Sequence, residues 1–317
     1  MTATQAKPTG AAAQTALKFS TSTYAYGHWD LDKALESIAR VGYTGVEILT
    51  HGVRRPDGKG GQEMNYHLRP EWPADRIEAV KQQLAKLDLT PNCVSPSSDF
   101  ITPAHGSVQA DIDEVCRHVD LAVQIGAPLV RPFAANRLPE GMTPDAAIKQ
   151  ISDALRSCGQ YAQSKGVRIA VENHGEFPGV SENMIAILKA TNHPAIGLTL
   201  HIPRNNAEQL IEEVPDKIWH MHLGSPQSKH GREIRQLRSQ GKSREDIAQQ
   251  LGIALDEVPE GSLALGEGDT DYTAIVRAVQ ATGYTGWWNH EGGPEPNPEP
   301  TEQRSVTFLR RTLLPQG

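Results

Sequence analysis

Three short runs, VRIAVE at residues 167–172, AIGLTLH at 195–201 and KIWHMHL at 217–223, decide the fold of this chain. Each is largely apolar and has the length of a buried strand. The segments between them are long enough for a crossover helix, and a strand, a crossover and a second strand make the basic unit of a parallel sheet. The sequence therefore predicts successive βα units in this part of the chain.

The same alternation extends over the chain from Leu17 onward. The five further strand candidates are LKFSTST (17–23), TGVEIL (44–49), TPNCVS (90–95), PLVRPF (128–133) and TGWWNHE (285–291). Segments between the strands, such as LDKALESIARVG at 31–42, carry apolar residues three and four apart and end in glycine, as amphipathic helices do. Eight strands with intervening helices favour an α/β fold of the closed (β/α)8 or TIM-barrel type over an open doubly wound sheet, which usually stops at five or six strands.

The predicted organisation is one catalytic barrel domain over residues 17–317, preceded by a disordered leader at 1–16. Two stretches interrupt the alternation. Residues 225–266 follow the seventh strand and contain patterns such as REDIAQQLG, which predicts a helical insertion there. A Gly-rich loop is predicted after the second strand, at residues 55–72, where the sequence is RPDGKGGQEMNYHLRPEW. Both stretches are candidates for a lid over the barrel, with a solvated surface decoration as the alternative.

Composition excludes several classes of protein. The 317 residues include 31 Lys and Arg against 38 Asp and Glu, for a formal net charge of -7. An acidic chain argues against nucleic acid as the main partner, and no apolar run approaches the ~18 residues of a membrane span. The three cysteines have no CxxC spacing and read as ordinary buried thiols. Because the leader lacks a sustained apolar core of the kind found in secretion signals, we expect a cytoplasmic protein.

Polar residues concentrate at the ends of the last four predicted strands. Glu172 ends the fifth strand, His201 the sixth and Glu291 the eighth, while His220 and His222 lie in the seventh. The carboxyl ends of barrel strands meet at one mouth, where barrel enzymes carry their active sites. Two buried carboxylates repel each other unless a cation joins them, and mixed carboxylate and imidazole ligands suit a divalent metal. The sequence therefore predicts a metal site, with His222 as the better-placed histidine of its strand and His220 one layer deeper.

Other residues near strand ends are candidates for substrate binding, although a single histidine at a strand end is more often a hydrogen-bonded structural residue. Several aromatic residues near the mouth, Tyr24 and Phe133 among them, are candidates to stack on a sugar ring. The substrate-binding candidates are His51, Arg131, His174, Glu176, Lys229 and Trp288.

The motifs VENHG, GLTLH, HMHL and GYTGWWNHE together resemble the xylose isomerase-like barrel superfamily, often called sugar phosphate isomerases/epimerases or the AP endonuclease 2-type family. The resemblance covers essentially Leu17 to Leu314, with GYTGVEI near the start as a supporting motif. It implies that the metal ligands are Glu172, His201, His222 and Glu291. It also implies one divalent ion, with Mn favoured and Co, Zn, Fe or Mg as alternatives.

The chain departs from the superfamily pattern in three places. The sixth-strand ligand is usually Asp and is His201 here, which makes the ligand set less anionic and favours Mn²⁺, Co²⁺ or Zn²⁺ over Mg²⁺. The Arg that follows the HxH motif in ketose 3-epimerases is missing. The second substrate-binding Glu of those enzymes is replaced by Pro178. These departures argue against a close ketohexose epimerase.

The function implied by the resemblance is that of a metal-dependent sugar isomerase or epimerase. Glu172 and Glu291 would act as the acid/base pair that moves a proton next to a metal-bound carbonyl through an enediolate. The first alternative is a metal-dependent lyase or dehydratase acting on a keto-sugar, keto-glycoside or cyclic polyol. The remaining alternatives are DNA repair of the endonuclease IV type and a non-catalytic sugar-binding barrel. The expected partner is a small carbohydrate. The resemblance to the superfamily also implies a homo-oligomer.

Overall fold

The fold was analysed in a computed structural model, which describes residues 18–59, 61–203, 207–224, 230–259 and 262–313. The leader predicted at 1–16 and the candidate residue Lys229 lie outside these ranges.

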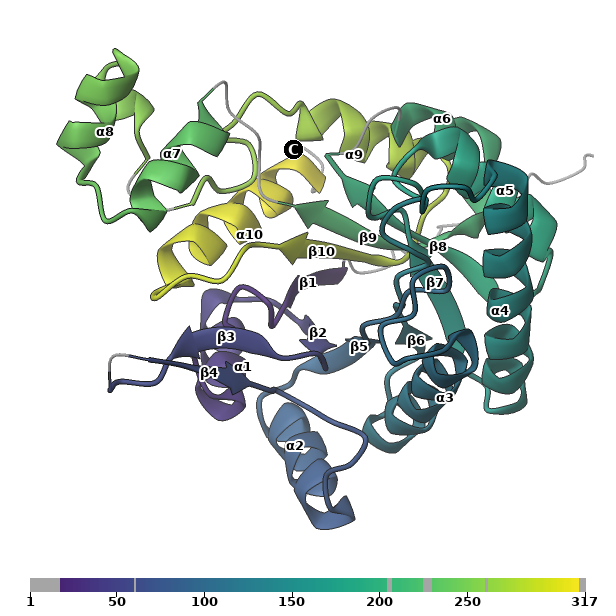
Figure 1. The fold of residues 1–317 in the computed structure, drawn as a ribbon. Helices are drawn as coiled ribbons and strands as arrows, with labels where there is room; N and C mark the ends of the chain where they lie inside the picture. The colour runs from purple at the N-terminus through teal and green to yellow at the C-terminus, as the bar shows by residue number, and fades with distance from the viewer. Residues whose placement is uncertain (1–17, 60, 204–206, 225–229, 260–261, 314–317) are drawn as a thin grey trace, which may run out of the picture.

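Eight parallel strands close into a barrel, in the order β1-β10-β9-β8-β7-β6-β5-β2 (Figure 1). The predicted (β/α)8 architecture is therefore confirmed. The strands are β1 (Lys18–Ser22), β2 (Gly45–Leu49), β5 (Thr90–Ser95), β6 (Leu129–Val130), β7 (Arg168–Glu172), β8 (Ile196–Ile202), β9 (Ile218–Gly224) and β10 (Trp287–Glu291). β6 is shorter than the predicted run 128–133, and Phe133 continues its line through an isolated parallel bridge to Glu172.

Helices cover the outside of the barrel, as repeated βα units require. They are α1 (Leu31–Val41), α2 (Ala74–Lys86), α3 (Val108–Ile125), α4 (Pro144–Ser164), α5 (Ser181–Thr191), α6 (Ala207–Glu213), α9 (Tyr272–Ala281) and α10 (Glu299–Leu313). Local chemistry sets their ends. The Ser107 hydroxyl accepts a hydrogen bond from the Ala110 amide at the start of α3, and Gly126 ends that helix at φ 83°, where a residue with Cβ would be strained.

Alternation along each strand decides which side chains face the barrel interior. In β10 the side chain of Asn289 points inward, where it accepts a hydrogen bond from Ser20 of β1 at 2.9 Å. Trp288 therefore points outward and packs edge-on against Tyr284 at a ring distance of 5.2 Å within the hydrophobic core. Inward-facing positions of β10 thus reach the mouth, and outward-facing positions bind the helical layer.

The stretch expected as a Gly-rich loop at 55–72 forms a β-hairpin at its start. β3 (Val53–Pro56) pairs antiparallel with β4 (Gln62–Asn65). Ion pairs from Arg55 to Asp30 at 2.7 Å and to Glu63 at 2.8 Å fasten the hairpin. The expectation of a loop is wrong for β3 and β4, because cross-strand pairing and the hydrogen bond from the Asp57 amide to the carbonyl of Gly61 give this polar segment a sheet of its own.

The predicted helical insertion follows β9. It contains α7 (Gly231–Ser239), α8 (Arg244–Leu251) and the short 3₁₀ helix η2 (Leu255–Glu257); another, η1 (Pro215–Lys217), precedes β9. These elements bury a small core of their own, made of Ile234, Leu237, Ile247, Ala248 and Val258. Figure 1 shows α7 and α8 at the periphery of the molecule, away from the barrel axis. The insertion is thus a small appended unit.

Among the described residues, no helix has both the length and the apolar character that a membrane crossing would need.

Candidate metal centre at the barrel mouth

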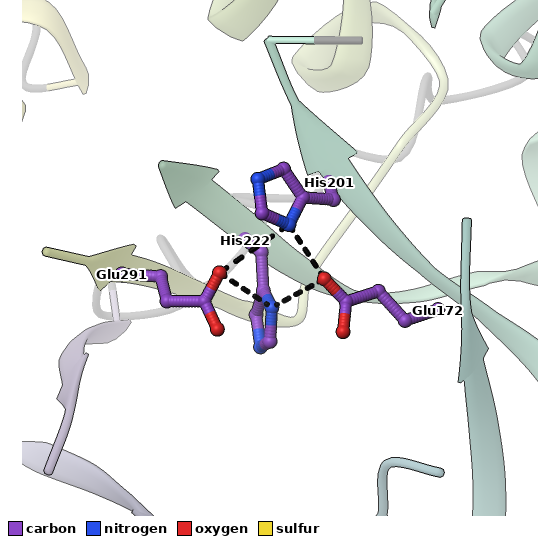
Figure 2. Close-up of side chains that lie close together, drawn as sticks. All are labelled: Glu172, His201, His222 and Glu291. Atoms are coloured by element: carbon purple, nitrogen blue, oxygen red, sulfur yellow. Dashed lines mark hydrogen bonds and ion pairs between the residues drawn. The ribbon is translucent and has the colours of Figure 1, made fainter. Parts of the chain in front are cut away.

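Four neighbouring strands bring the predicted ligand set together. Glu172 ends β7, His201 lies near the end of β8, His222 lies in β9, and Glu291 ends β10. His201 and His222 are register partners in adjacent strands, so their rings lie side by side. One ligand atom from each of the four side chains lies within 4.8 Å of all the others. Figure 2 shows the two carboxylates on opposite sides of the imidazoles, pointing toward a common centre.

The imidazoles present their Nδ1 atoms to both carboxylates. Nδ1 of His201 lies 2.5 Å from Oε1 of Glu172 and 3.3 Å from Oε2 of Glu291. Nδ1 of His222 lies 3.3 Å and 3.4 Å from the same two oxygens (Figure 2). Two nitrogens and two carboxylate oxygens therefore converge, which is a donor set for a divalent transition metal.

The electrostatics of the cluster call for positive charge at its centre. Burial alone would lower the pKa of His222, but Glu291, Glu47 and Glu172 outweigh it and raise that pKa well above its usual range. Burial would raise the pKa of Glu172, yet Arg131 and His222 hold it well below its usual range. The pKa of Glu291 is lowered in the same way by His222. The ionised carboxylates face an imidazolium proton at the centre of the cluster. A divalent cation at the same point would neutralise their charge more completely.

A further carboxylate, that of Glu47 in β2, contacts the cluster through His222. Its Oε2 lies 2.6 Å from Nε2 of His222 and 2.9 Å from Nε2 of His220. Ser95 donates to its Oε1, and the amide of Asn289 donates to Oε2 at 3.3 Å. A carboxylate that accepts from Nε2 of His222 leaves Nδ1 of that ring for the centre, so Glu47 fixes the tautomer of a candidate ligand.

Sequence reasoning missed Glu47 and Asn289. Glu47 lies inside the motif GYTGVEI, which contributed only to the resemblance, and the available signal was a lone charged residue within an otherwise apolar strand. Strand alternation then places Glu47 on the same inward face as the neighbouring ligands.

The layer beneath the centre is a structural network. Glu47, Cys93 and His220 form a second cluster with metal-ligand atoms. All three are fully buried, and burial together with Glu47 raises the pKa of the Cys93 thiol well above its usual range. Because a thiol must lose its proton to bind a metal, this group is a poor ligand set. His220 lies one layer deeper than His222, where it binds Glu47.

Arg131 lies between the two layers. Its guanidinium is buried, with Nη2 3.4 Å from Oε1 of Glu47 and Nη1 3.2 Å from Oε2 of Glu172. The second approach lacks hydrogen-bond geometry, so Oε2 of Glu172 has no hydrogen-bond partner among the described residues. Burial would lower the pKa of Arg131, but Glu172 and Glu47 outweigh it and raise the pKa above its ordinary value. Arg131 thus neutralises part of the buried carboxylate charge.

A cavity of about 380 Å³ opens beside the centre. It brings the candidates His51, Arg131 and His174 together with His201 and Glu291. The remaining lining residues are Tyr24, Leu49, Phe133, Gly224 and Gly293. Of these, Leu49 and the two glycines are residues that sequence reasoning did not single out.

Two candidates for substrate binding do not line this cavity. Glu176 is exposed on the loop after β7, where its amide binds the carbonyl of Asn136. Trp288 is 2% exposed and faces the helical layer rather than the mouth. The prediction that Trp288 contacts substrate does not agree with this position, because its strand places alternate residues, Asn289 and Glu291, on the inner face.

A model of the family described as xylose isomerase-like TIM barrel matches residues 35–312. The chain belongs to the xylose isomerase-like TIM barrel family. The resemblance seen in the strand-end motifs is thereby confirmed. No curated protein matches the chain.

Solved structures share the xylose isomerase-like fold over nearly the whole chain. The 3-keto-D-glucoside 4-epimerase YcjR from E. coli has a TM-score of 0.65 at 16% identity, covering 93% of this chain and 99% of that one. A D-tagatose 3-epimerase-like protein has a TM-score of 0.68 at 15% identity, with coverages of 94% and 97%. The probable 3-DHS dehydratase AsbF from Bacillus anthracis has a TM-score of 0.64 at 14% identity, with coverages of 92% and 98%. At such identities the likeness establishes the shared barrel.

Proposed function

We propose that this protein is a divalent-metal-dependent sugar isomerase or epimerase that moves a proton next to the carbonyl of a keto-sugar or of a polyol that carries a keto group. The observation that carries the proposal is the position of two carboxylates, the buried Glu172 and the partly buried Glu291, on opposite sides of the His201 and His222 nitrogens beside a ligand-sized cavity. The solved structures that share this barrel include proteins named as sugar epimerases, which supports the choice of reaction.

The residues at the centre fit a divalent ion. Four donor atoms converge, and Oε2 of Glu172 is buried without a hydrogen-bond partner among the described residues. When bound, a divalent ion supplies polarisation of the substrate carbonyl, which acidifies the neighbouring C–H. With two neutral imidazoles and two carboxylates as ligands, the set suits Mn²⁺, Co²⁺ or Zn²⁺ better than Mg²⁺.

The protein's own groups perform the proton transfers. Glu172 and Glu291 are both ionised, because their pKa values lie below the usual range, so either can accept a proton from substrate carbon. Arg131 keeps Glu172 in place at 3.2 Å, and the two histidines fix the opposite sides of the centre. A proton removed by one carboxylate and returned by the other on the opposite face gives epimerisation, and return at the neighbouring carbon gives isomerisation.

The alternative is a lyase or dehydratase, which shares the first proton abstraction and then expels a β-substituent. Its supporting observation is that AsbF, a protein named as a probable dehydratase, has the same barrel. The identity of the product separates the two reactions. The cytoplasmic location and the homo-oligomer stay predictions.

The experiment that tests the proposal follows solvent deuterium into a keto-sugar, with methyl 3-keto-D-glucoside as the probe and Mn²⁺ added. Glu172→Gln and Glu291→Gln are each expected to slow exchange by about 100-fold or more, the usual contribution of general acid–base catalysis. Glu302→Gln is the matched control, since Glu302 is equally buried but lies on α10 outside the barrel. Exchange that survives both changes at the centre would overturn the proposal.

A further inference from the structure

A second, smaller cavity of about 220 Å³ lies next to the mouth cavity. Its lining includes Thr50, Tyr66, Ser97 and His118, and His51 lines both cavities. The larger cavity is within the usual range of ~300–1,000 Å³ for small-molecule sites, whereas the smaller one falls below it. The smaller cavity thus fits one part of a ligand that extends past His51.

His118 presents an unused hydrogen-bond acceptor to this cavity. The residue is 2% exposed, and its Nδ1 donates to the carbonyl of Glu114 at 2.8 Å. Burial lowers the pKa of His118, so its ring is neutral and Nε2 carries a lone pair. Nε2 has no hydrogen-bond partner among the described residues. A buried acceptor without a donor is costly, so this atom calls for a hydroxyl or another donor from a ligand.

Thr50 supplies a second unused group. It is 5% exposed, and its hydroxyl has no hydrogen-bond partner among the described residues. A hydroxyl can both donate and accept, so Thr50 and His118 together match a ligand that carries several hydroxyl groups.

The wall of the cavity is aromatic on one side. The ring of Tyr66 lies over Gly52, where an added Cβ would meet ring carbons at 2.8 and 2.9 Å. The guanidinium of Arg69 lies 4.5 Å from the centre of the Tyr66 ring. The absence of a Cβ at Gly52 therefore allows the Tyr66 ring to pack closely against the chain at the wall of the cavity.

The charged groups of the cavity already have partners. Arg69 pairs with Glu71 at 3.1 Å, His105 pairs with Asp111, and Arg117 pairs with Glu114. An ionised ligand would therefore meet no unpaired opposite charge among these groups. The cavity therefore favours an uncharged ligand.

We propose that the smaller cavity is a second sugar subsite, which holds the neutral, hydroxyl-bearing part of a two-ring substrate while the keto ring lies at the centre. The inference rests on the proposed function for the location of the reacting ring. His51 connects the two subsites: its Nδ1 lies 3.3 Å from the carbonyl of Ser95, which leaves Nε2 as an acceptor for a hydroxyl of either ring.

The test compares methyl 3-keto-D-glucoside with 3-keto-maltose, which share the keto ring and differ in the group attached to it. Binding is measured by calorimetry in the Mn²⁺-loaded protein, and solvent deuterium exchange is measured in parallel. The wild-type protein is expected to bind 3-keto-maltose at least tenfold more tightly. Thr50→Val and His118→Leu are each expected to weaken binding of 3-keto-maltose by about fivefold, the usual effect of one neutral hydrogen bond, and to leave methyl 3-keto-D-glucoside unchanged.

Tyr24→Phe serves as the control, because Tyr24 lines only the larger cavity and its loss should affect both sugars alike. Thr50→Val removes a hydroxyl that has no partner and retains the side-chain volume, so it keeps the test valid if His118→Leu unfolds. Equal affinity for the two sugars, or variants that weaken both equally, would overturn the second subsite while exchange still supports the proposed function. Absence of exchange with both sugars overturns the proposed function, and the calorimetric comparison then decides the subsite by itself.

Discussion

Glu47→Gln is the change that most directly tests whether a buried charge behind His222 strengthens metal binding at the candidate centre. The substitution keeps the shape of the side chain and removes one negative charge from a fully buried position. That charge lies 2.6 Å from Nε2 of His222, on the side of the ring opposite the centre. If the charge of Glu47 makes Nδ1 of His222 a better ligand, the Glu47→Gln variant must bind the ion less tightly than the wild-type protein.

The magnitude follows from Coulomb's law. The contact of 2.6 Å, the width of an imidazole and a metal–nitrogen bond of about 2 Å place Glu47 roughly 6 Å from the ion. At an effective dielectric of about 20, one negative charge at that distance stabilises a divalent ion by about 5.5 kcal/mol. It stabilises the competing imidazolium, whose charge is centred roughly 4 Å away, by about 4 kcal/mol. The net loss is about 1.5 kcal/mol, or about 10-fold in Kd, the lower end of the ~10–100-fold found when groups behind metal ligands are changed.

The assay is a titration of the metal-free protein with Mn²⁺ in competition with a chelating dye, at one fixed pH for all variants. Glu302→Gln is the control because Glu302 is 1% exposed and binds a histidine, His290, at 3.0 Å, but on the outer side of β10. Thermal unfolding shows whether both variants fold. A Kd for Glu47→Gln within twofold of wild type, or an equal loss in both variants, would show that the charge of Glu47 does not strengthen metal binding.

Three further changes test other parts of the structure. His201→Ala removes one of four ligands, so near-stoichiometric metal in tag-free wild-type protein is expected to fall in the variant by elemental mass spectrometry. Burial lowers the pKa of His51 to about 4. Only the unfolded chain takes up this proton between about pH 6.5 and 4, so wild-type stability should fall by about 3 kcal/mol more than that of His51→Gln over this window in denaturant titrations. Trp288→Ala should cost about 3–5 kcal/mol of unfolding free energy and leave Mn²⁺ affinity unchanged, because Trp288 packs in the core.

The sequence was sufficient to predict the barrel and the meeting of four strand-end residues at its mouth. Both predictions depend on local patterns: apolar runs mark the strands, and the polar residue at the end of a parallel strand must lie at the common mouth. Glu172, His201, His222 and Glu291 therefore came together as expected. The stretch at 55–72 was predicted less well, because the antiparallel pairing of β3 and β4 involves polar residues and carries little hydrophobic signal.

Glu47 was not predicted and Trp288 was assigned to the wrong face of its strand. Both errors have the same cause, which is incomplete use of strand alternation. Strand alternation, which places both His220 and His222 on the inner face, also places Glu47 inward and Trp288 outward. Glu47 escaped notice because it lies before the end of its strand, and Trp288 was retained because aromatic residues often bind sugars. The loop residues of the two cavities, such as Tyr66 and His118, could not be found from local patterns, since their meeting depends on how the hairpin and α3 pack.

The charge balance of the buried groups favours a histidine over an aspartate at position 201. Glu47, Glu172 and Glu291 carry three negative charges, and Arg131 carries one positive charge, which leaves two negative charges around the centre. One divalent ion neutralises them. An aspartate in place of His201 would leave an extra negative charge in a region where an unpaired charge costs several kcal/mol. His201 and a divalent ion would together therefore complete a neutral core, and Glu47 and Arg131 would contribute to the proposed metal site as much as its ligands do.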